Sequence, residues 1–350
     1  MTIEGTKEAG TRIADLDALR GLAALAVVLF HYTTRYEELY GHERTLLLSV
    51  PWGHYGVQLF FGISGFVIFM TLDRTRSLTD FAVSRASRLY PAYWTAMALT
   101  TAAMLIAGMD DLLVSPAAFA VNATMLQGFV GAASVDGVYW TLGVELAFYA
   151  IMAALFQLRL LGRIEPLLLA WMSLHWFWTF APTFLGFEPS WLLGTIVIQA
   201  HIPFFAIGIA AFRLRSAAEP GWALAVIAAA LTTIAACDGF AAAAVAALSA
   251  ALLLLVALRG VVPGLGARPL VWLGAISYSL YLLHQYIGFA IIARLEAAGL
   301  DPHAAVAATL AAMLLLAAAV TYFVERPALK AIRTWYRGRS APADVAAAPA

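Results

Sequence analysis

The sequence places an arginine and a histidine in one long apolar stretch, LDALRGLAALAVVLFH, at residues 16–31. Arg20 and His31 are eleven residues apart, so on an α-helix their side chains project from nearly the same face, about 16 Å apart along the axis. Ionisable groups inside a membrane span usually face the protein interior or a wet cavity, which makes both residues functional candidates. The alternatives are that Arg20 reaches out to the membrane interface and that His31 is a hydrogen-bonded core residue.

A second pair, Arg85 and Arg88, lies in the segment DRTRSLTDFAVSRASRLYPAYW at residues 73–94. The two arginines are three residues apart, so on a helix they point the same way. Paired guanidinium groups can bind a phosphate through bidentate, charge-assisted hydrogen bonds. The pair is therefore a candidate phosphate site, although cytoplasmic loops of membrane proteins also collect arginine without any ligand.

Glu145 lies deep in another apolar stretch, GVYWTLGVELAFYAIMAAL. A carboxylate at that depth must pair, become protonated or face water. It is either part of a site or a structural partner for a buried arginine or tyrosine.

Polar side chains also form a stripe in the apolar segment ISYSLYLLHQYIGF. On a helix, Tyr278, Tyr281 and Gln285 share one face, and Ser277, Tyr281 and His284 share an overlapping one. Such a stripe lines a cavity or holds helices together, and the pattern favours neither.

Other kinds of site are not indicated by the residues. The 7 histidines are dispersed without metal-ligand spacing, so we expect no metal site. We find no P-loop, dinucleotide fingerprint or GxSxG elbow. The single cysteine, Cys237, allows no internal disulfide and no thiolate cluster.

Composition indicates an integral membrane protein. Of 350 residues, 63% are hydrophobic and 12% charged, whereas soluble domains carry about 25% charged residues. The mean hydropathy is +0.83. Because the net charge is zero and the pI is near 7.1, nothing suggests a nucleic-acid partner.

Hydropathy predicts an all-α, polytopic fold with about ten transmembrane helices. The segment 115–135 is apolar but contains Asn122, Gln127 and several glycines, so we expect a re-entrant or interfacial helix. The first span has no cleavage site, and we expect it to be retained. The predicted spans are 16–34, 55–72, 90–108, 138–158, 166–181, 191–212, 221–236, 240–258, 270–293 and 303–323.

Charge asymmetry predicts the orientation. With ten spans and a cytoplasmic N-terminus, every one of the 21 lysines and arginines except Arg35, Arg44 and Arg294 falls on the cytoplasmic side. The positive-inside rule expects such a split, so both termini are predicted to be cytoplasmic.

Six segments, in the same order and spacing, resemble the membrane-bound acyltransferase family 3, whose members O-acylate bacterial surface polysaccharides and some small molecules. The resemblance covers about residues 15–330. It implies a cytoplasmic segment at 1–15, a transmembrane acyltransferase domain at 16–330 and an Ala/Pro-rich cytoplasmic tail at 331–350, without the C-terminal hydrolase-like domain of some members. The segments are LDALRGLAALAVVLFH, VQLFFGISGFVIF, SRASRLYPAYW, YWTLGVELAFY, SYSLYLLH and FVERP.

The resemblance implies transfer of an acyl group, expected to be acetyl, from cytoplasmic acyl-CoA to a hydroxyl of an extracytoplasmic polysaccharide or lipid-linked sugar at the bacterial inner membrane. Acyl-CoA is then a co-substrate, with no permanently bound cofactor. Arg20, Arg85 and Arg88 would hold the CoA phosphates.

The implied reaction needs a general base, because a sugar hydroxyl is a poor nucleophile at neutral pH, and the pKa of histidine suits that role. His31 would be this base, with Glu145 orienting its imidazolium as the orienting residue of a hydrolase triad does; an acyl-histidine intermediate is the variant. Residues Tyr278, Tyr281 and His284 would line the acceptor path or donate to the oxyanion.

Two other classes stay open at the level of sequence. A secondary transporter would also show about ten spans with buried charge, although we see no repeated halves of the kind many transporters have. A non-catalytic subunit of a polysaccharide synthesis or export complex would tolerate changes at Arg20 and His31.

Overall fold

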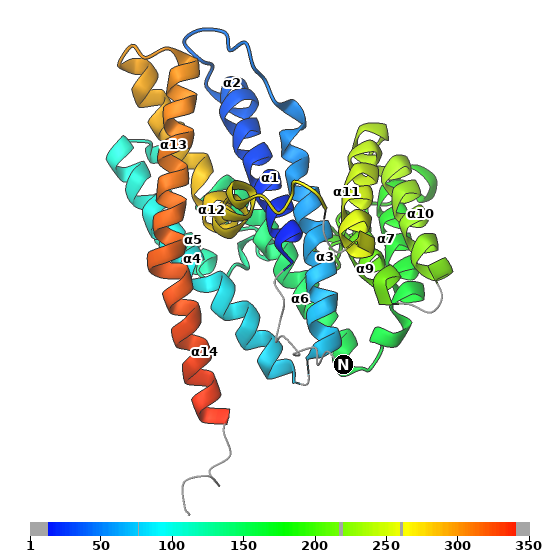
Figure 1. The fold of residues 1–350 in the computed structure, drawn as a ribbon. Coiled ribbons are helices and arrows are strands. Elements are labelled where there is room, and N and C mark those ends of the chain that lie inside the picture. The colour runs from blue at the N-terminus through cyan, green and yellow to red at the C-terminus, as the bar shows by residue number, and fades with distance from the viewer. Residues whose placement is uncertain (1–12, 76, 217–219, 260–261, 341–350) are drawn as a thin grey trace, which may run out of the picture.

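The computed structural model describes residues 13–75, 77–216, 220–259 and 262–340, and every regular element in these ranges is helical (Figure 1). The expected all-α class is therefore confirmed. The longer helices are α1 (Ala14–Phe30), α3 (Gly56–Arg74), α4 (Leu78–Ala107), α6 (Trp140–Gln157), α7 (Ile164–Leu185), α9 (Ile202–Ser216), α10 (Pro220–Cys237), α11 (Phe240–Arg259), α12 (Arg268–Ala297), α13 (Pro302–Val320) and α14 (Arg326–Ser340).

Two π-helical segments interrupt otherwise continuous helices. His31–Arg35 joins α1 to the short α2 (Tyr36–Leu39), and Thr321–Glu325 joins α13 to α14. Figure 1 shows α13 and α14 as one long helix along one side of the molecule, with α7, α10 and α11 gathered on the opposite side. Single π-helical turns inside α-helices are frequent at functional sites, and the first of these two begins at His31.

Within the described ranges, six helices are long and apolar enough to cross a membrane by length and composition. The predicted count of ten is not confirmed, because the predicted spans at 16–34, 90–108, 166–181 and 191–212 are not among these six. The six run over Pro51–Arg74, Gly137–Gln157, Pro220–Cys237, Phe240–Arg259, Arg268–Ala297 and Pro302–Arg339.

The predicted span over 191–212 is not one helix. The structure has α8 (Trp191–Ile196), a turn, and then α9 from Ile202. Ile198 in the turn has a φ of 46°, in the left-handed region, which a continuous right-handed helix does not contain. Hydropathy did not reveal this break because the average over 191–212 stays high despite Gln199 and His201 in the turn.

The ambiguous segment 115–135 folds as the short helix α5 (Pro116–Asn122) followed by turns. It packs against the middle of α4, where the Tyr93 hydroxyl donates to the Asn122 carbonyl and the Trp94 indole donates to the Ala123 carbonyl. The buried Asn122 side chain closes the loop by donating to the Ala133 carbonyl and accepting from the Val135 amide. The segment is thus a folded connection held by side chains and not a further span.

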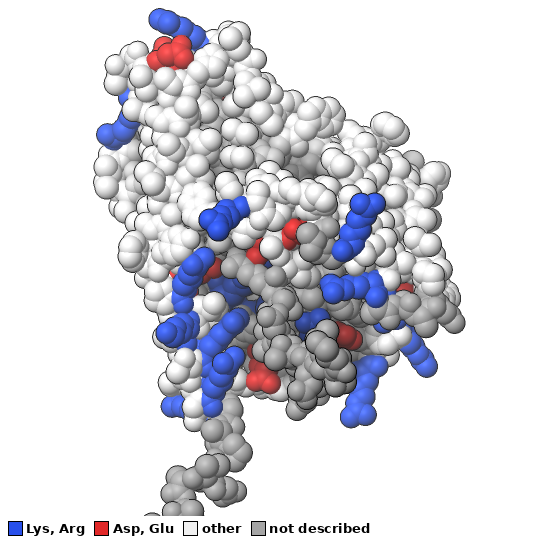
Figure 2. All heavy atoms as spheres, in the orientation of Figure 1, with Lys and Arg blue, Asp and Glu red and all other residues white. Residues whose placement is uncertain are grey.

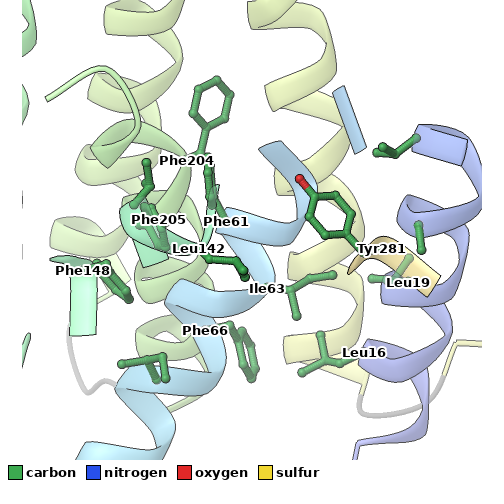
Figure 3. Close-up of a cluster of buried hydrophobic side chains, with 14 of the residues drawn as sticks. Leu16, Leu19, Phe61, Ile63, Phe66, Leu142, Phe148, Phe204, Phe205 and Tyr281 are labelled. Atoms are coloured by element: carbon green, nitrogen blue, oxygen red, sulfur yellow. The ribbon is translucent and has the colours of Figure 1, made fainter. Parts of the chain in front are cut away.

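The core lies where α1, α3, α6, α9 and α12 meet. Leu19, Phe66, Phe148 and Phe205 are fully buried there, and Figure 3 shows side chains from these helices converging. Its aromatic rings stack closely, as where Phe148 and Phe205 lie with centroids 4.0 Å apart.

Helix α1 packs most extensively against α12, and glycines let their backbones touch. A Cβ on Gly274 would lie 1.9 Å from the Asp17 carbonyl oxygen, and one on Gly21 would lie 2.6 Å from the Gly274 nitrogen. Small residues at such crossings are typical of membrane helix pairs.

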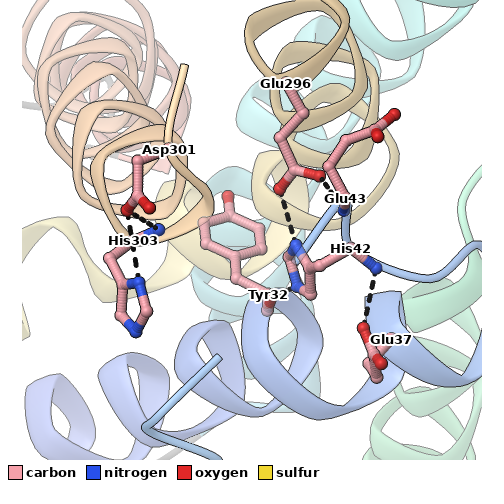
Figure 4. A network of polar contacts seen from close by, with 7 residues as sticks. All are labelled: Tyr32, Glu37, His42, Glu43, Glu296, Asp301 and His303. Atoms are coloured by element: carbon pink, nitrogen blue, oxygen red, sulfur yellow. Dashed lines mark hydrogen bonds and ion pairs between the residues drawn. The ribbon is translucent and has the colours of Figure 1, made fainter. Parts of the chain in front are cut away.

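A polar network fastens the chain after α2 to the end of α12 (Figure 4). The buried His42 ring contacts the Glu296 carboxylate at 2.6 Å through Nδ1 and the Tyr32 carbonyl at 2.9 Å through Nε2. The Glu43 amide donates to the other Glu296 oxygen. These contacts hold the connection against the same helix that α1 crosses.

We expect Gly274→Ala to destabilise the protein by about 1–3 kcal/mol, the usual cost of overpacking a close contact. Gly221→Ala in α10 is the matched control, because a Cβ there would meet nothing within 4 Å. The measurement is the thermal unfolding midpoint of both purified variants in detergent. Equal midpoints would show that α1 and α12 do not need this close approach.

Candidate active site

The three arginines singled out by the sequence line one narrow cavity of about 80 Å³. Arg20 comes from α1, and Arg85 and Arg88 come from the first half of α4. The other polar residues that line this cavity are Ser64, Thr141, Glu145, Tyr149, Ser277, Tyr278 and Tyr281.

His31 lines a separate and larger cavity of about 530 Å³ at the other end of α1. The walls combine aromatic rings with hydrogen-bonding groups, and they include Arg35, Tyr40, His54, Gln58, Trp140, Gln285 and Tyr286. Along α1, Arg20 and His31 are separated by about 16 Å.

The two cavities have only Val57 and Tyr281 in common among the residues that line them. The Tyr281 hydroxyl lies 3.0 Å from the Thr141 hydroxyl, and its ring packs edge-on against Phe60. Tyr281 therefore forms part of the partition between the arginine-lined cavity and the His31 cavity.

His31 contacts a second histidine, His284, on α12. His31 Nδ1 lies 2.9 Å from the Val27 carbonyl oxygen and 3.2 Å from His284 Nε2. His284 Nδ1 lies 2.8 Å from the Tyr281 carbonyl oxygen. Carbonyl oxygens only accept hydrogen bonds, so the network assigns a proton to Nδ1 of each ring. His284 Nε2 is then the acceptor, and His31 Nε2 has no partner among the described residues.

The structure brings His284, and not Glu145, into contact with His31. The Glu145 carboxylate instead accepts hydrogen bonds from the Ser64 and Tyr149 hydroxyls in the arginine-lined cavity. There it attracts Arg20 electrostatically. The expected Glu145–His31 contact is thus not among the described contacts, and Glu145 belongs with the arginines.

The arginines are only partly neutralised by nearby groups. Arg20 lies 3.7 Å from the Asp17 carboxylate, and it is repelled by Arg88. Arg85 donates to the Ser84 hydroxyl, while its Nε is buried without a partner among the described residues. Buried guanidinium groups of this kind need an anion.

The three predicted acceptor-site residues on α12, Tyr278, Tyr281 and His284, lie in different places in the structure. Tyr278 lines the arginine cavity and donates to the Leu89 carbonyl. Tyr281 lines both cavities, and the fully buried His284 lies behind His31 and lines neither of them. Of the three, only Tyr281 is placed to touch a ligand in the His31 cavity.

Two buried carboxylates near the site were not among the sequence candidates. Glu325, in the second π-helical segment, accepts from the Ser279 hydroxyl and attracts Arg88. Asp136 accepts from the amides of Val138 and Tyr286 and fixes the start of α6 to α12. A carboxylate within an apolar surrounding was the available signal for Glu325, and Asp136 gave no such signal because it lies in a connection.

Comparison with known proteins shows which protein family the chain resembles. A family model described as "Acyltransferase domain" matches residues 13–322. The "Exopolysaccharide production protein ExoZ" of Rhizobium meliloti (strain 1021) is 29% identical over 329 residues, covering 87% of this chain and 95% of that protein. "Nodulation protein 10" of Rhizobium leguminosarum bv. viciae is 33% identical over 131 residues, 32% of this chain and 35% of that protein. No solved structure matches the chain.

The match covers most of the chain and includes Arg20, His31, both arginines of α4 and the α12 histidine. It agrees with the helical, membrane-spanning character of the structure. The chain therefore belongs to acyltransferase family 3, as a multi-pass membrane protein.

Proposed function

We propose that the protein transfers an acyl group, acetyl first of all, from acyl-CoA bound at the arginine-lined cavity to a glycan hydroxyl in the His31 cavity. The observation that carries this proposal is that two cavities of different chemistry meet at Tyr281 and Val57. One offers three guanidinium groups, and the other offers a histidine with an unoccupied ring nitrogen.

Charge distribution supports the direction of transfer. On the face shown in Figure 2, Lys and Arg gather over the lower end of the molecule, around the start of α4 and the end of α14. The positive-inside rule assigns such an end to the cytoplasm, where acyl-CoA is made. His31, farther along α1, then lies toward the extracytoplasmic side of the bacterial inner membrane.

The wall of the His31 cavity supports a sugar acceptor. Gln58, Gln285 and Arg35 offer hydrogen-bond donors, and Tyr40 and Trp140 offer aromatic faces. Sugar rings need both, because they carry many hydroxyls and present apolar C–H faces. ExoZ, named for exopolysaccharide production, is covered over 95% of its length, which favours a polysaccharide or its lipid-linked precursor.

In the proposed reaction His31 Nε2 removes the proton of the acceptor hydroxyl as its oxygen attacks the thioester carbonyl. The carbon–sulfur bond then breaks, and the thiolate leaves with the proton that His31 returns. His284 accepts from His31 Nδ1 throughout and keeps the ring oriented, as the orienting residue of a hydrolase triad does.

We expect His31→Ala to lower transfer by at least about 100-fold, the lower bound for loss of a general base. His284→Gln should cause a smaller loss, since it removes orientation and leaves the base. His54→Gln is the control, because His54 lines the same cavity but contacts the Pro51 carbonyl. The measurement is transfer of labelled acetyl from acetyl-CoA in membranes at matched expression.

That expectation fails if His31→Ala transfers acetyl at near the wild-type rate, or if His54→Gln is as damaging as His31→Ala. Because His31 lies outside the arginine-lined cavity, acetyl-CoA should still bind to His31→Ala. Loss of binding there would indicate a misfolded variant, and the smaller change His31→Gln would replace it.

We expect Arg20→Gln and Arg88→Gln each to weaken acetyl-CoA binding by about tenfold or more, the value of one charge-assisted hydrogen bond. Arg35→Gln is the matched control, because Arg35 lines the His31 cavity instead. Isothermal titration of the purified variants gives the Kd. Unchanged affinity in both arginine variants would place the donor elsewhere.

A further inference from the structure

Beside the arginine-lined cavity, α4 and α14 enclose a second hollow of about 330 Å³. It lies at the end of the molecule where basic side chains gather in Figure 2. Its lining residues are Asp80, Val83, Ser84, Arg333, Tyr336 and Arg337.

Ser84 connects this hollow to the arginine-lined cavity. Its hydroxyl accepts one hydrogen bond from Arg85 at 3.1 Å and another from Arg333 at 3.3 Å. Arg85 lines the first cavity and Arg333 lines the hollow. The two spaces are therefore neighbours, and a single hydroxyl holds a guanidinium of each.

The two arginines that line the hollow outnumber its one lining carboxylate, Asp80. Arg333 is repelled by Arg85, Arg88 and Arg337. The carboxylate that lines the hollow, Asp80, accepts from the Tyr336 hydroxyl at 2.9 Å. Like charges held together by the fold are stabilised by a bound anion.

A second observation points to an anionic ligand at the same place. Arg85 Nε is a fully buried donor without a partner among the described residues. An unsatisfied buried donor costs about 1–3 kcal/mol, more for a charged group. It belongs to the side chain that lines the cavity and donates to Ser84 of the hollow, so the unsatisfied donor is part of the connection between the two spaces.

We propose that Ser84, Arg333 and Arg337 bind the 3′-phosphate of the CoA nucleotide, while the diphosphate lies nearer Arg85 and Arg88. This rests on the proposed function, in which CoA is the donor. CoA carries its 3′-phosphate on the ribose, one sugar away from the diphosphate, so two adjacent anion sites match it. An anionic lipid headgroup offers the same phosphate chemistry, and the test separates the two.

The experiment compares the Kd of CoA with that of 3′-dephospho-CoA, measured by titration of the purified full-length protein. In the wild type, loss of the 3′-phosphate should weaken binding about ten- to hundredfold. In Arg333→Gln and Arg337→Gln this ratio should fall toward one, with the Kd of 3′-dephospho-CoA nearly unchanged. Arg339→Gln is the control, since its guanidinium lies over the Trp335 ring at 4.3 Å and the ratio should persist.

Equal wild-type affinity for the two nucleotides overturns this inference and leaves the donor assignment intact. A ratio that survives in both Arg333→Gln and Arg337→Gln also overturns it, because the phosphate is then held elsewhere. If the wild-type ratio disappears when phosphatidylglycerol is added to phosphatidylcholine nanodiscs, the hollow is a lipid headgroup site. If neither nucleotide binds to the wild type, the proposed donor itself is wrong.

Discussion

The backbone contact between α1 and α12 is the constraint on which the candidate site depends. At one end Gly21 and Gly274 allow the helices to touch, and farther along the Tyr32 hydroxyl donates to the His284 carbonyl over Gly288. Between these points the spacing of the two helices is fixed, and the His31–His284 distance is fixed with it. A side chain at either glycine would spread the helices and open the hydrogen bond between the two rings.

The same crossing explains how the fold carries buried charge. Arg20 and its neighbours lie between helices that also present Glu145 and Glu325, yet each carboxylate is engaged by hydroxyl donors as well. The carboxylates therefore hold the arginines in place without satisfying every guanidinium donor. If every arginine were fully paired with a carboxylate, the fold would be more stable, but no guanidinium donor would remain to bind a ligand. Because the pairing is partial, the arginine-lined cavity keeps free donors and favours an anion.

Local features of this site were predictable from sequence, and contacts between distant segments were not. Helix geometry predicts the spacing of Arg20 and His31 and of Arg85 and Arg88. In the structure Arg20 lies on α1, His31 directly follows that helix, and Arg85 and Arg88 both lie on α4. The partner of His31 lies 253 residues away, and helical periodicity says nothing about which helices pair. Glu145 was therefore assigned to His31 by analogy with hydrolase triads, although the fold places it one cavity away. Hydropathy likewise located six of the ten predicted spans but did not reveal the turn at Ile198, because the average hydropathy over 191–212 stays high across a few turn residues.

The use of a histidine as the orienting partner fits the position of His31. A carboxylate in that place would also orient the ring, as in a hydrolase triad, but it would bring a formal charge into the apolar crossing of α1 and α12. The neutral His284 accepts the same hydrogen bond without bringing a charge into an apolar crossing. His31 thus has a fixed orientation and one ring nitrogen without a partner among the described residues; in the proposed reaction it would carry a charge only while the acyl group is being transferred. In that reaction the charge on His31 would form next to the polar wall of the His31 cavity, where hydrogen-bonding groups can stabilise it. The packed contact between α1 and α12, which sets the position of the ring, would carry no added charge.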